Sequence, residues 1–255
     1  MYRSNMITAL PKPKIDVEFR VVRRAHVYTA GGVDYPSVTK ILGVIDNGKS
    51  NALAIWARRE ALKLAQNELF GALDGGITLG YENVAEIIKS ADRQPDRLKD
   101  AAADLGTRVH EAIDAYILGK DPVLDEESAV GFTNFIDWMS KEKIRIISGD
   151  IPVASPEWGF GGRLDSVGVN DKDEIIILDW KTSNALRDEY PLQVAAYAIA
   201  FEEMYGLRVA GGKVVRFGKT NPADFEPRDV NLSDAKLAFL KALGLFKAMK
   251  AELWA

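Results

Sequence analysis

Ile-Ile-Ile-Leu-Asp-Trp-Lys at residues 175–181, preceded by Gly-Gly-Arg-Leu-Asp at residues 161–165, is the stretch that decides the fold. The β-branched run of the later segment predicts a strand, and the polar residues around Lys172 predict the turn that joins it to the earlier one. A turn centred near Lys172 places Asp165 opposite Asp179 across a β-hairpin. The sequence therefore predicts two facing carboxylates on paired strands.

Side chains of a strand alternate between its two faces. Lys181 therefore shares a face with Asp179, and Arg163 shares one with Asp165. The opposite face of the later strand is apolar throughout: Ile176, Leu178 and Trp180. Charged groups at the edge of a core are costly unless they are paired or bind a metal ion. The hairpin is therefore a candidate metal site.

A hairpin with a cross-strand ion pair near the surface is the simpler interpretation of the same residues. Asp-x-Lys alone is a weak pattern, and Asp234-Ala235-Lys236 matches it as well. That second match lies in a run of helical spacing from 232 to 253 and lacks an opposing carboxylate. The glycine pair at 161–162, the facing Asp165 and the β-branched run that ends at the motif favour a functional site at the first match.

These residues resemble a known family. Asp165 with Asp179-x-Lys181 resembles the PD-(D/E)xK nuclease signature, and the details are closest to RecB-type nuclease domains and the mitochondrial genome maintenance exonuclease. Gly-Thr-Arg-Val-His at 106–110 resembles the upstream helical motif that supplies a metal-binding histidine. Gln-Val-Ala-Ala-Tyr at 193–197 resembles the downstream Q-x-x-x-Y motif. The motifs occur in the order that the family has.

The resemblance extends beyond these motifs, from about residue 35 to about residue 200. Residues 35–42, followed by Trp56, are similar to the start of the exonuclease group. One position departs from the pattern, because Leu164 stands before Asp165 where the family often has proline. RecB-type members vary at that position.

The resemblance implies an α/β fold with a restriction-endonuclease-like mixed sheet core flanked by helices. Helical spacing in the first half of the chain adds a helical N-terminal subdomain. We expect a single nuclease domain over 1–255. A tail and a first strand extend to about residue 25, a mostly helical part covers about 26–141, and the sheet core with the active site covers about 142–255.

Hydrophobic spacing and turn residues also predict the individual elements. A hairpin over 26–38 turns at Gly31-Gly32, and Ser37 caps a short helix that extends to Leu42. Further helices are expected at 51–69, 82–90, 96–118, 125–141, 191–205 and from 232 onward. Strands are expected at 144–147 and 151–158, in the central hairpin, and at 213–217.

The resemblance implies that Asp165, Asp179, the main-chain carbonyl of Trp180 and His110 hold Mg²⁺ or Mn²⁺. A histidine at the margin of an apolar helix stripe is by itself more often a core or surface residue than a metal ligand. If His110 is a ligand, the set contains both nitrogen and oxygen donors, which suits Mn²⁺ as well as Mg²⁺. Lys181 would orient or deprotonate the attacking water, or stabilise the transition state. All three roles stay open.

Three more residues are candidates for the site. Gln193 and Tyr197 are four apart and share a helix face, which by spacing alone also fits an ordinary amphipathic helix with Tyr197 in the core. The family resemblance suggests that Gln193 contacts the metal-bound water or Lys181 and that Tyr197 supports the site. Glu157 is a possible further metal ligand, or an incidental surface residue.

Contacts with DNA phosphates are expected from Arg163, Thr182, Ser183 and Lys49. The net charge of −4 argues against a large basic footprint on duplex DNA, although cations bound at the site would offset part of it. Lys49 belongs to a basic cluster in the N-terminal helices, which fits a solvated helix face equally well.

The composition of the chain restricts its class and its expected location. With 255 residues and 47% hydrophobic content, the chain can form a full core. It has no cysteine, so an intracellular, cytoplasmic protein is expected, and the family suggests a bacterium or one of its viruses as the source. The sequence contains no run of eighteen apolar residues, so no membrane span is predicted. The basic first fourteen residues, interrupted by prolines, are expected to be a disordered tail rather than a targeting segment.

The function expected from the resemblance is that of a metal-dependent DNA exonuclease acting on single strands or DNA ends, with a role in recombination and repair. A structure-selective endonuclease of the same fold is the nearest alternative. A nucleic-acid-binding module with a dead site is another, and the complete set of Asp165, Asp179 and Lys181 argues against it. A metal-binding protein unrelated to nucleic acids is the most distant alternative.

Overall fold

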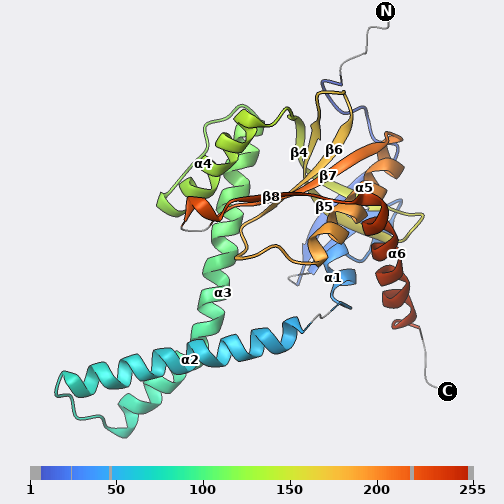
Figure 1. The fold of residues 1–255 in the computed structure, drawn as a ribbon. Coiled ribbons are helices and arrows are strands. Elements are labelled where there is room, and N and C mark those ends of the chain that lie inside the picture. Colours follow the sequence, from blue (N-terminus) through green and yellow to red (C-terminus); the bar gives the residue numbers. More distant parts are fainter. Residues whose placement is uncertain (1–6, 24, 46–47, 219–220, 252–255) are drawn as a thin grey trace, which may run out of the picture. The chain divides into compact units, whose positions relative to one another are not determined.

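The computed structural model describes residues 7–23, 25–45, 48–218 and 221–251 (Figure 1). The first six residues of the expected N-terminal tail therefore lie outside the described part of the chain. Internal contacts divide the chain into two compact units, one made of 1–45 with 106–255 and the other of 46–105. Because the two are separate bodies, each is described on its own.

The larger unit is built on a five-stranded sheet with the order β4-β5-β6-β7-β8. The strands are β4 Arg145–Ser155, β5 Phe160–Val169, β6 Ile175–Lys181, β7 Val209–Arg216 and β8 Glu226–Asp229. Only β6 and β7 run parallel, because α5 (Glu189–Tyr205) carries the chain back between them. The expected α/β fold with a mixed sheet flanked by helices is therefore confirmed.

Helices cover both faces of this sheet (Figure 1). On one face, α5 packs with α1 (Val38–Leu42) and α6 (Leu232–Ala248) over the odd-numbered residues of β6. On the other face, α4 (Glu126–Lys141) places Phe135 and Trp138 against Trp180, with ring centroids 5.6 and 5.8 Å apart. The strand that carries the motif is thus buried on both sides, as its sequence predicts.

A second, three-stranded sheet precedes α1. It consists of β1 Val17–Val22, β2 Ala25–Ala30 and β3 Val33–Tyr35, all antiparallel. The chain turns between β2 and β3 at Gly31 and Gly32, which have φ values of 57° and 77° that favour glycine. Ser37 caps α1 by accepting a hydrogen bond from the Lys40 N–H. Both features were expected from the sequence.

The smaller unit contains α2 (Lys49–Asp74) and the first part of α3 (Tyr81–Ile117). The two helices expected at 82–90 and 96–118 are wrong as separate elements, because α3 runs through Pro95 without a break. A proline inside a helix removes one hydrogen bond and costs about 3 kcal/mol. Good helix formers on both sides of Pro95 offset this cost. Among the described residues, no helix is long and apolar enough to cross a membrane.

Three strand expectations also need correction. The segments expected at 144–147 and 151–158 belong to one strand, β4. Its pairing with β5 shifts register between Ile146 and Ser148 and continues through the polar residues that separate the two segments. Strand β7 begins at Val209 rather than 213, ahead of a glycine pair that weakens the strand pattern. Strand β8 was not expected, since Pro227 lies within it, and an edge strand tolerates proline.

Candidate active site

The facing carboxylates lie where the sequence places them. Strands β5 and β6 pair in the register Ser166 to Leu178 and Val169 to Ile175, so one further step brings Asp165 opposite Asp179. Oδ2 of Asp165 accepts a hydrogen bond of 2.8 Å from the main-chain N–H of Trp180. This bond fixes the Asp165 side chain against the end of β6, where the strand leaves the core.

Asp179 is fully buried, with no exposed surface. Neither of its carboxylate oxygens has a hydrogen-bond partner. The Lys181 ammonium lies 2.5 Å from Oδ2, but this ion pair lacks the geometry of a hydrogen bond. Burial raises the pKa of Asp179, against the opposing effect of Lys181, and the neighbouring Asp165 raises it further. A fully buried carboxylate that has one lysine as its partner and a second carboxylate nearby can accept a further cation.

Lys181 is the cationic partner of Asp179 in this ion pair. Its side chain is 16% exposed, and the ring of Tyr190 at the start of α5 lies 5.1 Å from Nζ. Burial by itself would lower the pKa of Lys181, but Asp179 and then Asp165 outweigh that effect, so its pKa is raised. The ammonium form is therefore firmly held. Tyr190 is a contact that the sequence reasoning missed.

His110 comes to the hairpin from α3. Its Nε2 lies 3.1 Å from the carbonyl oxygen of Trp180, and its Nδ1 lies 3.7 Å from Oδ1 of Asp165. One turn earlier on the helix is Gly106, where an added Cβ would lie 2.9 Å from Oγ1 of Thr182. The absence of a side chain at Gly106 thus lets α3 approach the end of β6 closely enough for His110 to reach the site.

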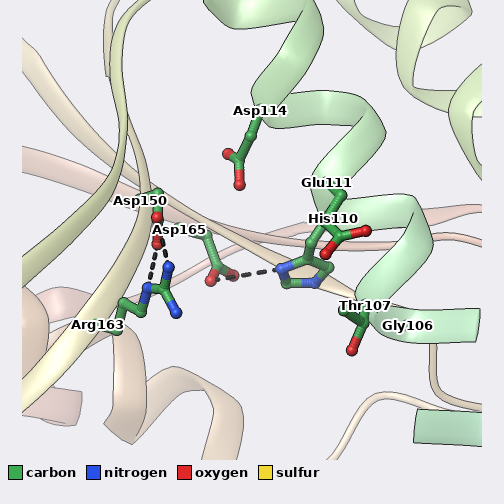
Figure 2. A pocket seen from close by; sticks show the side chains of 8 residues that line it. All are labelled: Gly106, Thr107, His110, Glu111, Asp114, Asp150, Arg163 and Asp165. Carbon is green, nitrogen blue, oxygen red and sulfur yellow. Dashed lines mark hydrogen bonds and ion pairs between the residues drawn. The ribbon is translucent and has the colours of Figure 1, made fainter. Parts of the chain in front are cut away.

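A cavity of about 400 Å³ opens beside these groups (Figure 2). Its lining residues, from α3, β4 and β5, are Gly106, Thr107, His110, Glu111, Asp114, Asp150, Arg163 and Asp165. Burial, with the charges of Asp150 and then Asp165, raises the pKa of Asp114 to about 6. Because four of the lining residues are acidic and one is an arginine, the cavity carries an excess of negative charge.

Asp114 and Asp150 were not predicted from the sequence, although the position of Asp114 leaves a signal there. Asp114 lies four residues after His110, so the two share a face of α3. Asp150 binds Arg163 across β4 and β5 through Nε and, at 2.5 Å, through Nη2. Asp150 has a positive φ of 54°, which is unusual for a residue within a strand. The sequence does not indicate this irregularity of β4.

Gln193 and Tyr197 come together as the spacing on α5 predicts. The Gln193 amide donates a hydrogen bond of 2.7 Å to the Tyr197 hydroxyl. Tyr197 is 4% exposed and packs on Gly162, where a Cβ would lie only 2.5 Å from Cε1 of the ring. Burial raises the pKa of Tyr197 well above its usual value, and the charges of Asp179 and Asp165 raise it further. The tyrosine is therefore both a core residue and a neighbour of the carboxylates.

Other candidate residues lie elsewhere or are engaged. Glu157 lies in the turn between β4 and β5, where its N–H donates to Glu203, and it lines a different cavity. Thr182 approaches Gly106, while the Ser183 hydroxyl donates to the carbonyl of Ala185. The structure thus does not bring Glu157 to the hairpin. Lys49 begins α2, and its side chain lies outside the described part of the structure.

The donor groups fit a divalent cation, although their side chains have not converged on one point. Within the described ranges, no three His, Asp or Glu side chains form a group that could hold a metal ion as they stand. Asp179 nevertheless lies at the end of β6 with three other possible ligands, because His110 contacts both Asp165 and the Trp180 carbonyl there. Oxygen with one imidazole nitrogen is chemistry that suits Mn²⁺ and Mg²⁺.

Comparison with protein families decides which group of proteins shares this arrangement. The family model of the PD-(D/E)XK nuclease superfamily matches residues 123–252, which contain the hairpin and α5. The chain belongs to the PD-(D/E)XK nuclease superfamily. Members of this superfamily generally use divalent metal ions. The subgroup, RecB-type or otherwise, is not decided by this match.

The other comparisons add little to this assignment. No curated protein matches the chain. Among solved structures, the one described as "Crystal structure of SSO0001" is similar to 60% of this chain and 76% of its own, with 15% identity and a TM-score of 0.30. That similarity is too low to carry an argument. The family match and the geometry of the hairpin therefore carry the functional assignment.

Proposed function

We propose that this PD-(D/E)XK nuclease is a divalent-metal-dependent DNA exonuclease of the RecB type, acting on single strands or at DNA ends. The observation that supports this most directly is Asp179. A buried carboxylate that is paired with one lysine and lies beside a second carboxylate, Asp165, is costly unless a further cation balances the charge. A metal ion is the ligand that fits this donor set.

His110, Asp165, Asp179 and the Trp180 carbonyl would hold the metal. When bound, Mg²⁺ or Mn²⁺ lowers the pKa of a water molecule and neutralises the charge that develops on the phosphate. Glu157 is not part of this ligand set, because it lies in the turn beyond β4. Asp114 borders the same cavity and adds to its negative charge.

Lys181 is the group that we assign to the attacking water and the scissile phosphate. Asp179 and the ring of Tyr190 hold its ammonium from two sides, so its position is fixed before substrate binds. The raised pKa keeps it protonated near neutrality, which favours orientation of the water and charge stabilisation over removal of a proton. Its pKa would fall when a metal ion binds beside it.

Tyr197 and Gln193 support the site from α5. The Tyr197 ring packs against β5 at Gly162, three residues before Asp165, and its hydroxyl is held by Gln193. This packing keeps β5 and α5 in a fixed relation. We assign Gln193 and Tyr197 to the site as supporting residues. A direct contact of Gln193 with Lys181 or with a metal-bound water stays a prediction.

Single-stranded or terminal DNA is the substrate that the charge distribution favours. A protein that binds duplex DNA independently of sequence is usually basic, whereas this chain has a net charge of −4 and an acidic cavity. Arg163 is bound to Asp150, so this arginine is already partly neutralised. We expect only a narrow set of phosphate contacts, with Thr182 and Ser183 among them.

A panel of labelled DNA substrates tests this function. The purified protein is incubated with linear single strands, linear duplex and circular single strands in Mn²⁺, Mg²⁺ or EDTA. An exonuclease digests the linear DNA, spares the circles and is inactive in EDTA. Cleavage of circles would identify an endonuclease instead. Binding without any cleavage in either metal would indicate a module with a dead site.

A further inference from the structure

The small β1–β3 sheet lies against the strand that leads to the catalytic carboxylates. Ser37 forms an isolated bridge with Gly161, and the Gly161 N–H donates to the carbonyl of Pro36 at 3.0 Å. A Cβ added at Gly161 would lie 2.4 Å from Cβ of Tyr28, so the sheet sits directly on β5. Only a glycine at this position allows so close an approach.

The contacts follow β5 toward the site. Gly161, Arg163 and Asp165 share one face of β5, because side chains alternate along a strand. Tyr28 lies over Gly161, and the Phe19 ring lies over Arg163, with its centroid 5.1 Å from Cζ. The next position on that face is Asp165. Phe19 is therefore one side-chain step from the proposed metal ligands.

Beyond Phe19, the same face of the small sheet is open to solvent. The cross-strand pairs are Phe19 with Tyr28 and Val21 with His26. The His26 ring lies 5.3 Å from the Phe19 ring at an interplanar angle of 85°. His26 is exposed, and Val21 is 59% exposed. An aromatic surface thus begins at the edge of the catalytic cavity and continues outward.

Arg163 makes this surface rigid. Its guanidinium is bound by Asp150 through two nitrogens, and Phe19 rests on the same guanidinium. A guanidinium fixed in this way supports the ring by a cation–π contact and has little freedom to turn toward a substrate. Rings held in a fixed orientation bind a flat partner with less loss of conformational freedom.

A cationic side chain shares a second cavity with His26. His26, Asp34, Tyr35, Thr39 and Lys40 are among the residues that line this cavity of about 650 Å³, and Arg20 and Thr29 bind the Asp34 carboxylate. Lys40 and Thr39 are exposed. An ammonium and a hydroxyl beside an exposed ring suit a single-stranded nucleic acid, because the backbone follows the charge and a base stacks on the ring. An uncharged apolar partner would not need the cation.

We propose that the exposed ring of His26, held edge-to-face by Phe19, is a stacking platform for an unpaired nucleobase near the proposed catalytic site. Lys40 contacts a phosphate on the outer side. This inference rests on the proposed nuclease function and specifies its substrate as a single strand. Bases paired in a duplex are stacked on one another and cannot lie on the platform, so the platform distinguishes unpaired from paired DNA near the site.

Binding of a fluorescent thymidine oligonucleotide in EDTA tests the platform, with single abasic sites placed at successive positions. For wild type, one abasic position should weaken binding about tenfold, in line with the loss of one stacked base. His26→Ala should bind the intact oligonucleotide about tenfold more weakly and be insensitive to that abasic position. His26→Tyr should restore both affinity and sensitivity.

Two further variants separate stacking from folding. Phe19→Leu keeps apolar bulk in the half-buried position but removes the aromatic ring, so it should reproduce His26→Ala while melting at nearly the wild-type temperature. Val22→Ala removes an exposed apolar side chain from the opposite face of β1 and should bind like wild type. Circular dichroism melts of each variant identify any loss of fold.

The outcomes are distinct from those that test the nuclease function. Equal sensitivity to every abasic position in wild type and His26→Ala would overturn the platform, even if linear DNA is digested. Failure of wild type to bind the oligonucleotide would overturn it as well. Position-specific abasic effects without any cleavage in Mn²⁺ or Mg²⁺ would instead leave the platform standing and contradict the proposed activity.

Discussion

Neutralising Asp114 should stabilise the protein at high pH and leave its stability unchanged at low pH. Burial and the charges of Asp150 and Asp165 raise the pKa of Asp114 from 3.8 to about 6. The folded state therefore holds this proton more tightly than the unfolded chain does. The carboxylate contributes no penalty below the unfolded pKa, and its full penalty once the pH has risen through the folded pKa.

The magnitude follows from this shift. A difference of about 2 pKa units corresponds to about 3 kcal/mol, at 1.36 kcal/mol per unit. Because Asp114 is only half-buried, solvent screening reduces this to about 1–1.5 kcal/mol. For a chain of this size, such a gain raises the melting temperature by roughly 2–6 °C.

Urea and thermal unfolding of Asp114→Asn in EDTA measure this effect at about pH 8, above the folded pKa, and at about pH 3, below the unfolded pKa. The gain should appear at the higher pH and nearly vanish at the lower one. Glu111→Gln is the matched control, since it removes a charge from the same helix at an exposed position and should change stability by less than about 0.5 kcal/mol. Equal gains at both pH values, or none at the higher, would refute the electrostatic reasoning.

Three other variants test separate parts of the site. Asp179→Asn should weaken Mn²⁺ binding at least about tenfold in a calorimetric titration, while Asp234→Asn in the other Asp-x-Lys match should not. His110→Ala should reduce the fall in Mn²⁺ affinity at acidic pH, because a protonated imidazole cannot coordinate; protonation of Asp179, whose pKa is raised, accounts for the remaining fall, and a fall of unchanged size would exclude His110 as a ligand. Gly162→Ala should lose about 1–3 kcal/mol in urea unfolding because its Cβ meets Tyr197, whereas Gly71→Ala, in open space on α2, should lose nothing.

The hairpin was predictable because its information is local. The alternation of side chains and the position of the turn fix which residues of β5 and β6 face each other, and Asp165 comes opposite Asp179 as a result. The caps of α1 and α4 are likewise set by residues within one helical turn, Ser37 and Asp125. Short-range geometry needs no knowledge of the rest of the fold.

The parts of the site that were not predicted from the sequence depend on contacts between segments that are far apart in the chain. Asp150 enters the site only because β4 pairs with β5 through an irregular register, and Tyr190 meets Lys181 only because α5 returns across the sheet. Neither contact leaves a periodic pattern in the sequence. Similarly, nothing near Phe19 indicates that its ring lies on Arg163, since the two are far apart in the chain. Tertiary packing alone brings them together.

The most direct test of the central assignment compares two lysines that follow the same Asp-x-Lys pattern. Lys181 lies in the hairpin beside Asp179, whereas Lys236 lies on α6 and binds Glu202 at 2.6 Å. The measurement is the rate at which a labelled linear single strand is digested in Mn²⁺ by Lys181→Ala and by Lys236→Ala. Lys181→Ala should lose at least about a hundredfold in rate, whereas Lys236→Ala should digest the strand at nearly the wild-type rate. A Lys181→Ala protein that retains more than about a tenth of the wild-type rate would contradict the assignment of this hairpin as the catalytic centre.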